Sequence, residues 1–255
     1  MDPRPIPANH TPSADALKDR VVMVTGAGDG IGRAVAIECA RRGATVVLVG
    51  RTQRKLESTY DAIDALGAPR PAILMLDLAT TTVAEYAGVA ASLHEGYGRL
   101  DGLAHVAGVL GARTPLDQYD AKVWAQVLAV NLTAPFLLTQ ALLPLLRASR
   151  DPAVVFTSSS VGRKGRAFWG GYAVSKFGLE GLMQCWSDEL ETLSRPIRMN
   201  SLNPGPTRTA MRLEAYPAED RDRLATPEQV APAFVYLLSG DSAEHTGQAF
   251  DAQPR

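Results

Sequence analysis

Short apolar runs alternate along this chain with segments in which apolar residues recur at helical spacing. The strand-like runs are VVMVT at 21–25, TVVLV at 45–49, PAILML at 71–76, GLAHVAG at 102–108, AVVFTSS at 153–159, IRMNSLN at 197–203 and QAFDA at 248–252. Helical spacing is clearest at 31–43 and between Asp120 and Arg147. Short apolar strands separated by helices predict a parallel sheet with helices on both faces. We therefore expect a single doubly wound α/β domain with a sheet of about seven strands.

The first 18 residues differ from the rest of the chain, because they contain four prolines and several small polar residues. We expect residues 1–18 to form a flexible or surface-draped extension and residues 19–255 to form one domain. The extension has no apolar stretch like that of a signal peptide. No run approaches the roughly 18 consecutive apolar residues of a membrane span. The sequence thus predicts a cytoplasmic protein with no membrane partner.

Charge and cysteine spacing argue against several other classes of protein. The 255 residues carry a net charge of −1, which gives no reason to expect nucleic acid as a partner. Cys39 and Cys185 lie far apart in predicted helices, and neither they nor the four histidines show metal-ligand spacing. We therefore expect no metal site, and we interpret both cysteines as small core residues.

The first strand-like run leads into a glycine-rich segment, TGAGDGIG at 25–32. Between a strand and a helix, such a segment is typical of a dinucleotide-binding Rossmann fold. Glycine permits the tight turn and lets a pyrophosphate approach the free N–H groups at the helix N-terminus. Taken alone, the segment is better explained as an ordinary turn, and the motifs downstream decide for the cofactor. The expected contacts are Gly26, Gly28, Gly30, Ile31 and Gly32.

The end of the second strand-like run bears on the choice between NAD and NADP. NAD-binding folds usually carry an acidic residue there, which binds the ribose hydroxyls. This chain has Gly50 instead, followed by Arg51, Thr52, Arg54 and Lys55. Cations at this place suit a 2′-phosphate, whereas Asp29 in the glycine loop favours NAD. We expect NADP, with contacts from Arg51 and Thr52, and the alternative for Arg54 and Lys55 is a solvated helix face.

Three polar residues in the second half of the chain indicate the chemistry. Tyr172 and Lys176 are four residues apart, so on a helix they share a face and the ammonium can favour the ionised phenol. Tyrosine, with an ordinary pKa near ~10, needs such a cation to act as acid and base at neutral pH. Ser159 would hold the substrate oxygen. With the glycine loop, these residues predict nicotinamide-dependent redox chemistry at a carbonyl or alcohol carbon.

Several motifs, in this order and at these spacings, resemble the short-chain dehydrogenase/reductase family from about residue 19 to the end. They are TGAGDGIG, VNLTAPF around Asn131, Ser159, YAVSK at 172–176 and NPGPTRT at 203–209. FTSSSVGRKGRA, NPGPTRTAMR and FDAQP are similar, more narrowly, to the YciK-type bacterial oxidoreductases. The resemblance implies that Asn131 bends its helix and helps to bind a proton-relaying water, the alternative being a cap or kink residue. It implies that Asp77 contacts the adenine, the alternative being a cap.

Two further segments carry expected cofactor contacts by resemblance. HVAG at 105–108 departs from the family's usual NNAG, because Val106 replaces the second asparagine, and it contributes Ala107 and Gly108. In the NPGPTRT segment, the contacts implied for the nicotinamide end are Pro204, Gly205, Thr207 and Thr209. Both threonines could instead serve the turn.

These expectations combine into one function. We expect an NADP-linked oxidoreductase acting on a small carbonyl or secondary-alcohol substrate, with Tyr172 as acid and base. The alternative is a cofactor-binding sensor or scaffold without turnover, against which the presence of Ser159, Tyr172 and Lys176 argues. The resemblance also implies a homodimer or homotetramer that pairs helices at about 116–147 and 171–194.

A cluster of basic and aromatic residues suggests a hypothesis about the substrate. Arg163, Lys164, Arg166, Phe168 and Trp169 lie between Ser159 and Tyr172, and Arg208 and Arg212 open the family's lid region at 206–224. Lids of this kind close over substrate. We therefore consider a substrate with an anionic group, such as a carboxylate or phosphate, which at least one of these arginines binds. The stronger alternative is that these charges face solvent or a subunit interface.

Overall fold

The computed structural model describes residues 3–7, 10–191 and 196–253. Over these residues the chain forms one sheet of eight parallel strands in the order β1-β8-β7-β6-β5-β2-β3-β4. The strands are β1 (Arg4–Pro5), β2 (Val21–Thr25), β3 (Thr45–Gly50), β4 (Ala72–Met75), β5 (Gly102–His105), β6 (Ala153–Thr157), β7 (Arg198–Asn203) and β8 (Ala249–Asp251). The predicted doubly wound α/β fold is confirmed.

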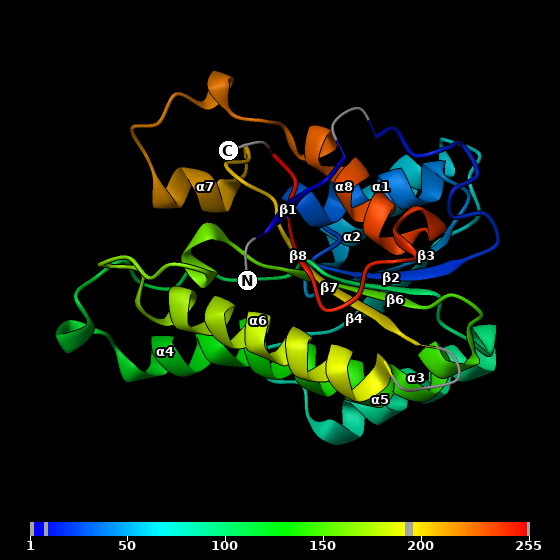
Figure 1. Ribbon diagram of the computed structural model, residues 1–255, viewed down its shortest axis with the longest axis horizontal. Helices are drawn as coiled ribbons and strands as arrows, with labels where there is room; N and C mark the ends of the chain where they lie inside the picture. The colour runs from blue at the N-terminus through cyan, green and yellow to red at the C-terminus, as the bar shows by residue number, and fades with distance from the viewer. Residues whose placement is uncertain (1–2, 8–9, 192–195, 254–255) are drawn as a thin grey trace.

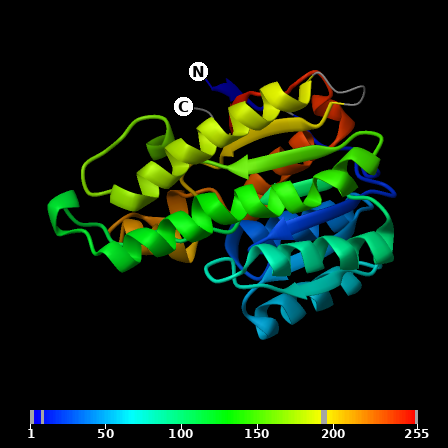
Figure 2. The ribbon, with the colours of Figure 1, turned by 90° about the horizontal axis from the view of Figure 1, so that it is seen from below.

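Helices cover both faces of the sheet (Figure 1). On one face lie α1 (Gly30–Arg41), α2 (Gln53–Asp64) and α8 (Pro227–Leu238). On the other, seen in Figure 2, lie α3 (Val83–Tyr97), α4 (Ala121–Leu128), α5 (Ala134–Ala148) and α6 (Gly170–Glu191). Strand side chains alternate between the two layers: Val22 and Val24 join the α1 and α8 side, whereas Val21 and Met23 join the α3, α5 and α6 side. Residues 192–194, the expected end of α6, lie outside the described residues.

The functional end of the sheet is set by the strand order. After β2 the chain builds outward through β3 and β4, and it then returns to β5 on the other side of β2. The carboxyl ends of β2 and β5 therefore flank a topological switch point, the place where open α/β sheets bind ligands. The short helix α7 (Ala210–Ala215) stands beyond the sheet, apart from both helical layers (Figure 1).

The described part of the N-terminal segment lies against the domain and supplies the eighth strand. β1 pairs with β8, and the N–H of Ile6 donates to the carbonyl of Asp251 at 3.1 Å. Leu17 is fully buried in the core layer that contains α1 and α8. Over these residues the segment is a surface strand followed by a buried anchor rather than a detached tail. A strand of two residues is too short to leave a hydrophobic pattern in the sequence.

One continuous helix runs from Ala121 to Ala148, through α4, a π-helical turn at Ala129–Thr133 and α5. Its mean hydropathy of 1.5 and its length would by themselves allow it to cross a membrane. Half of that apolar stretch is buried inside the fold, however, and a core helix has the same composition. Pro135 follows the π-helical turn at the start of α5, so the helix accommodates this proline with a wider turn rather than a break.

The two cysteines differ in their surroundings. Cys39 on α1 is buried, and burial raises the pKa of its thiol. Cys185 on α6 is exposed, so its interpretation as a core residue was wrong. The polar residues next to Cys185 did not indicate which face of the helix it lies on, so its exposure could not be predicted from them.

Candidate active site

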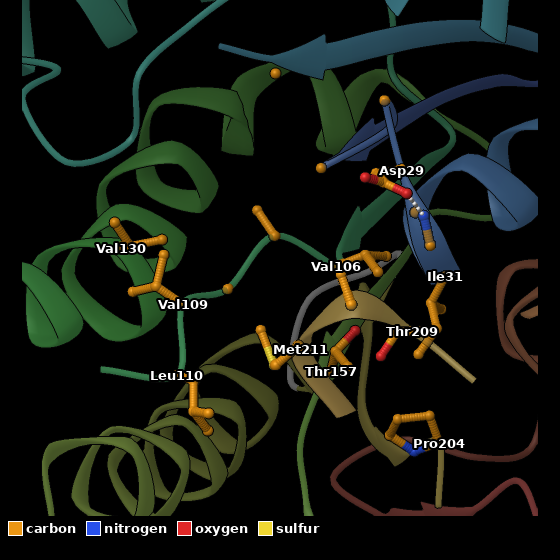
Figure 3. Close-up of a pocket in the computed structure, with 18 of the residues that line it drawn as sticks. Asp29, Ile31, Val106, Val109, Leu110, Val130, Thr157, Pro204, Thr209 and Met211 are labelled. Carbon is orange, nitrogen blue, oxygen red and sulfur yellow. Dashed lines mark hydrogen bonds between the residues drawn. The ribbon is translucent and has the colours of Figure 1, made fainter. Parts of the chain in front are cut away.

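A pocket of about 630 Å³ extends across the carboxyl ends of the strands, from the glycine loop to α6 (Figure 3). Nearly all the residues expected from the sequence line it, namely Gly26, Gly28, Gly30, Ile31, Gly32, Arg51, Thr52, Asp77, Ala107, Gly108, Ser159, Tyr172, Lys176, Pro204, Gly205, Thr207 and Thr209. Asn131 is the expected residue that does not. Segments that are far apart in the sequence thus meet at the switch point of the sheet.

The glycine loop is shaped for a close approach of backbone to backbone. Gly26 has a φ of +71°, and a Cβ there would lie 2.9 Å from the Cα of Ala107. A Cβ on Gly32 would lie 2.2 Å from the carbonyl oxygen of Gly26. No acidic side chain occupies the first turn of α1, whose N-cap Asp29 accepts from the N–H of Gly30 at 2.7 Å (Figure 3). The cradle therefore fits a pyrophosphate, which needs open backbone at a helix N-terminus.

At the end of the pocket beside β3, the cationic residues that follow this strand differ in their partners. Lys55 Nζ lies 2.5 Å from Asp29 Oδ2, and this contact with Lys55 lowers the pKa of the Asp29 carboxyl. Within the part of the chain that the structure describes, no ion pair engages Arg51, which lines the pocket beside Thr52. Arg51 is thus the guanidinium available at this end, while Lys55 and Asp29 offset each other's charge. Asp77 lines the same end, and its Oδ1 accepts from the N–H of Ala79 at 3.1 Å.

Ser159, Tyr172 and Lys176 lie on one wall of the pocket. Ser159 lies two residues after the end of β6 and makes a side-chain hydrogen bond with Tyr172 near the start of α6. One helical turn on, Lys176 Nζ donates to the carbonyl of Thr157 at 2.7 Å and lies 5.6 Å from the centroid of the Tyr172 ring. Burial raises the pKa of Tyr172 to about 12, and burial lowers the pKa of Lys176 to about 8.

These shifts correct one expectation from the sequence. We expected the Lys176 ammonium to lower the pKa of the Tyr172 phenol, but that pKa is raised, because loss of water around the phenol outweighs the hydrogen bond from Ser159. The same loss of water disfavours the charged form of Lys176 itself. The i, i+4 spacing correctly predicted that the two residues share a wall of the pocket. It carries no information on how strongly burial removes water from their side chains.

Asn131 sits in the π-helical turn and joins α6 to the loop that follows β5. Its Nδ2 donates to the carbonyl of Val109 at 2.9 Å and to Ser175 Oγ at 3.1 Å. Its Oδ1 accepts from the N–H of Val109 at 2.9 Å. Ser175 in turn donates to the carbonyl of Tyr172 at 2.7 Å. The Asn131 side chain therefore braces α6 against the pocket wall, and the proton-relay role stays a prediction.

The NPGPT segment forms the remaining wall near the glycine loop. Gly205 has a φ of +74°, and Thr207 Oγ1 donates to its carbonyl at 3.1 Å. Thr209 is the N-cap of α7, where its hydroxyl accepts from the N–H of Arg212 at 3.1 Å. Gln253, which the sequence reasoning missed, donates to the carbonyl of Pro204 at 2.8 Å and so ties the end of the chain to this wall.

Two more hydroxyls were missed at the end of β6. Thr157 Oγ1 and Ser158 Oγ are buried, line the pocket and have no hydrogen-bond partner in the structure. Buried polar groups normally find partners, so these two mark places where a polar ligand group fits. Their position immediately before Ser159, at the carboxyl end of a strand, was the signal available in the sequence.

Arg163 and Arg208, two of the arginines considered for an anionic substrate, have other partners. Arg163 does not line the pocket: its guanidinium contacts Glu180 Oε1 at 3.1 Å and Asp251 Oδ1 at 2.5 Å. Arg163 is therefore not placed to bind a ligand in the pocket, and the sequence did not indicate this because its partners lie 17 and 88 positions away. Arg208 lies 3.5 Å from Asp222. Phe168 is exposed, whereas its neighbour Trp169 lines the pocket.

His105, the last residue of β5, is buried in the fold. Its ring stacks on Phe156 with centroids 5.0 Å apart, and its Nε2 lies 2.9 Å from Thr139 Oγ1. Burial lowers the pKa of the imidazole to about 3, with a smaller contribution from the charge of Lys176. Among the residues that the structure describes, no three His, Cys, Asp or Glu side chains form a group that could hold a metal ion.

Comparison with known proteins agrees with this geometry. The family model of short chain dehydrogenases matches residues 20–220. The chain is 47% identical over 246 residues to the uncharacterized oxidoreductase YciK of Escherichia coli, covering 96% of each chain. A short chain dehydrogenase from Shigella flexneri complexed with NADP superposes with a TM-score of 0.92 at 47% identity, over 95% of this chain and 100% of that one. One from Escherichia coli complexed with NADPH gives 0.91 at 48% identity, over 95% and 100%.

Proposed function

Because this chain belongs to the short-chain dehydrogenase/reductase family, we propose that it is an NADP-linked oxidoreductase that interconverts a carbonyl compound and a secondary alcohol. The observation that carries this proposal is that Ser159, Tyr172 and Lys176 share one pocket with the glycine loop. A fold alone would not support a reaction, since function resides in the site.

The pocket fits the cofactor at each of its parts. The glycine loop and the start of α1 would hold the pyrophosphate, and Arg51 with Thr52 would hold the 2′-phosphate. Asp77 would contact the adenine, and Thr207 with Thr209 the nicotinamide carboxamide. When bound, the nicotinamide donates or accepts the hydride. The two solved relatives complexed with NADP and NADPH support the choice of NADP over NAD.

The protein's own residues handle the substrate oxygen and the proton. The Ser159 hydroxyl holds the substrate oxygen next to the phenol with which it is already hydrogen-bonded. Tyr172 has a pKa of about 12, so it carries the proton that reduction needs at neutral pH, and it depends on a neighbouring cation to release that proton. Lys176 lies one turn further along the same wall, where its ammonium stabilises negative charge that develops on the phenol oxygen.

The test is NADPH oxidation against a panel of ketones, aldehydes and quinones, with the wild type and Tyr172→Phe. The Phe variant should lose turnover and keep cofactor affinity, because it loses the transferable proton and keeps the ring. Tyr60→Phe is the matched control, since Tyr60 lies outside the pocket on α2. If Tyr172→Phe, shown to be folded, kept the wild-type kcat on a good substrate, the assigned acid would be wrong.

We further propose that the protein is a homo-oligomer that pairs through α6 and the long helix beside it. Val174 and Phe177 on α6 are 44% and 45% exposed, which leaves apolar surface uncovered on this face. Twofold dimers are the commonest closed assemblies. Light scattering at micromolar concentration should show a dimer or a tetramer, and a monomer alone would contradict the proposal.

A further inference from the structure

The substrate end of the pocket, beyond Ser159 and Tyr172, has an apolar wall. Leu110, Trp169, Met211 and Ala215 all line it, and they pack together as a small cluster separate from the two core layers. Leu110, Trp169 and Ala215 are only 5%, 8% and 4% exposed. In Figure 3, Leu110 lies on the side of the pocket away from Asp29 and Pro204, and Met211 lies between Leu110 and Thr157. A ligand there meets side chains that exclude water.

The charged side chains that α7 contributes to this end of the pocket do not offer a free cation to a ligand. Arg212 lines the pocket, but its Nε and Nη2 lie 2.6 and 2.5 Å from the two carboxylate oxygens of Glu219. Its guanidinium carbon also lies 4.0 Å from the centroid of the Tyr216 ring. Glu214, the other charged residue that α7 contributes to the pocket, is exposed and carries a carboxylate that would repel an anion. A buried carboxylate without a counter-charge is costly, so this end disfavours an anionic ligand.

Arg113, in the loop that follows β5, joins the two sides of this wall. Its guanidinium carbon lies 4.7 Å from the centroid of Trp169 and 5.1 Å from that of Tyr216. Its Nη1 donates to the carbonyl of Ala215 at the last residue of α7. Trp169 in turn lies 5.7 Å, between centroids, from Tyr172. Arg113 therefore bridges α7 and the aromatic ring that packs beside the candidate acid.

We propose that Arg113 is a positioning residue that holds the lid segment, residues 206–224, over the substrate end, and that the chamber so closed takes an uncharged, apolar ketone or alcohol. Resting on the proposed function, this names the substrate class of that site and a residue that sets it. Cation–π contact and a charge-assisted hydrogen bond together fix the end of α7, which stands apart from both helical layers of the sheet (Figure 1).

The substrate class is tested with a matched pair, a methylcyclohexanone and the oxocyclohexanecarboxylate substituted at the same ring carbon, each with NADPH. We expect kcat/KM for the neutral ketone to exceed that for the anion by at least about tenfold, because the carboxylate loses water without gaining a cation. Equal values, or a preference for the anion, would overturn the proposal. Saturation-transfer NMR measures binding of the same two molecules without turnover. Binding of the neutral ketone without any NADPH oxidation would therefore count against the proposed reaction and not against the chamber.

The role of Arg113 is tested with Arg113→Met and Arg113→Lys, with Arg150→Met as a control at an exposed arginine outside the pocket. Arg113→Met should raise the KM of the neutral ketone about tenfold, with kcat within about twofold and the Kd of NADPH unchanged. The KM of Arg113→Lys should lie between those of the wild type and Arg113→Met, because an ammonium can still donate to the carbonyl of Ala215 but stacks less well on the aromatic rings.

Hydrogen exchange followed by mass spectrometry supplies a readout that does not depend on activity. Arg113→Met should speed exchange in residues 206–224 and leave the sheet unchanged, whereas Arg150→Met should change neither. Unchanged exchange and KM in Arg113→Met would overturn the proposal. Faster exchange throughout the sheet would also overturn it, because that would give Arg113 a general role in stability.

Discussion

Replacing Arg163 by Met should destabilise the fold and leave the chemistry intact. Arg163 lies in the loop after Ser159, yet its guanidinium is directed into the protein toward α6 and β8. It contacts Glu180 and Asp251 and donates to the carbonyl of Phe250 at 2.9 Å. The side chains of Arg163, Glu180 and Asp251 are 13%, 10% and 8% exposed, so the cluster is almost fully buried from solvent.

The size of the effect follows from what the substitution leaves behind. Methionine keeps much of the apolar stem and removes the charge, so Glu180 retains its hydrogen bond from Ser201 at 2.6 Å and loses its cation. Removing one partner of a buried ion pair typically costs about 3–5 kcal/mol, because the remaining charge is no longer compensated. The free energy of unfolding should fall by an amount in this range. Lys164→Met, next in the sequence and exposed, should change it by less than about 0.5 kcal/mol.

Urea unfolding followed by circular dichroism measures this difference, and NADPH oxidation by the folded variant measures its effect on the chemistry. A second substitution, Glu180→Gln, should recover part of the lost stability in the Arg163→Met background, because it removes the uncompensated charge. An unchanged free energy of unfolding, or a selective loss of activity on anionic ketones, would refute this account. The second result would restore Arg163 as a substrate contact.

Two further predictions address the cofactor and the pH dependence of stability. Fluorescence titration should show tighter binding of NADPH than of NADH, and Arg51→Ala should narrow the difference by about ten- to a hundredfold, since a charge-assisted hydrogen bond contributes roughly 1.5–3 kcal/mol; equal wild-type affinities would contradict this. For His105, the native pKa of about 3 lies below the ordinary 6.5, so the unfolded chain binds the extra proton and stability falls as pH drops from about 6.5 toward 3. The slope attributable to this residue is about 1.4 kcal/mol per pH unit within that range. A folded His105→Gln variant should lack this slope in its free energy of unfolding, and the same pH dependence in variant and wild type would contradict the assignment.

Local spacing predicted the parts of the site that lie within one strand-turn-helix unit. The glycine loop and the pair Tyr172 and Lys176 were correctly placed on one pocket, because each motif is short and the topology of a parallel sheet brings strand ends together. The fold class followed for the same reason. What the spacing could not report was burial, and so the direction of the Tyr172 pKa was wrong.

Contacts between distant segments were beyond the reach of the sequence pattern. Nothing in the run around Arg163 indicates that a carboxylate 88 positions later would take its guanidinium. Likewise Arg113, Trp169 and Tyr216 come from three different segments, and their stacking depends on where α7 lies. A basic residue near a predicted active site is therefore a poor guide to substrate charge until its partners are known.

The pKa shifts of Tyr172 and Lys176 connect the lid with the proton chemistry. Burial is the first cause of both, and it acts in opposite directions because it penalises the ionised phenol and the charged ammonium alike. Trp169, packed beside Tyr172 and bridged to α7 by Arg113, forms part of that burial. Water admitted at this wall would lower the pKa of Tyr172 and raise that of Lys176, toward their ordinary values. A closed lid therefore keeps the pKa of Tyr172 above its ordinary value, whereas an open lid lets the phenol give up its proton more readily. The phenol is protonated at neutral pH in both states, so the lid changes the ease of proton transfer and not the form that enters the reaction.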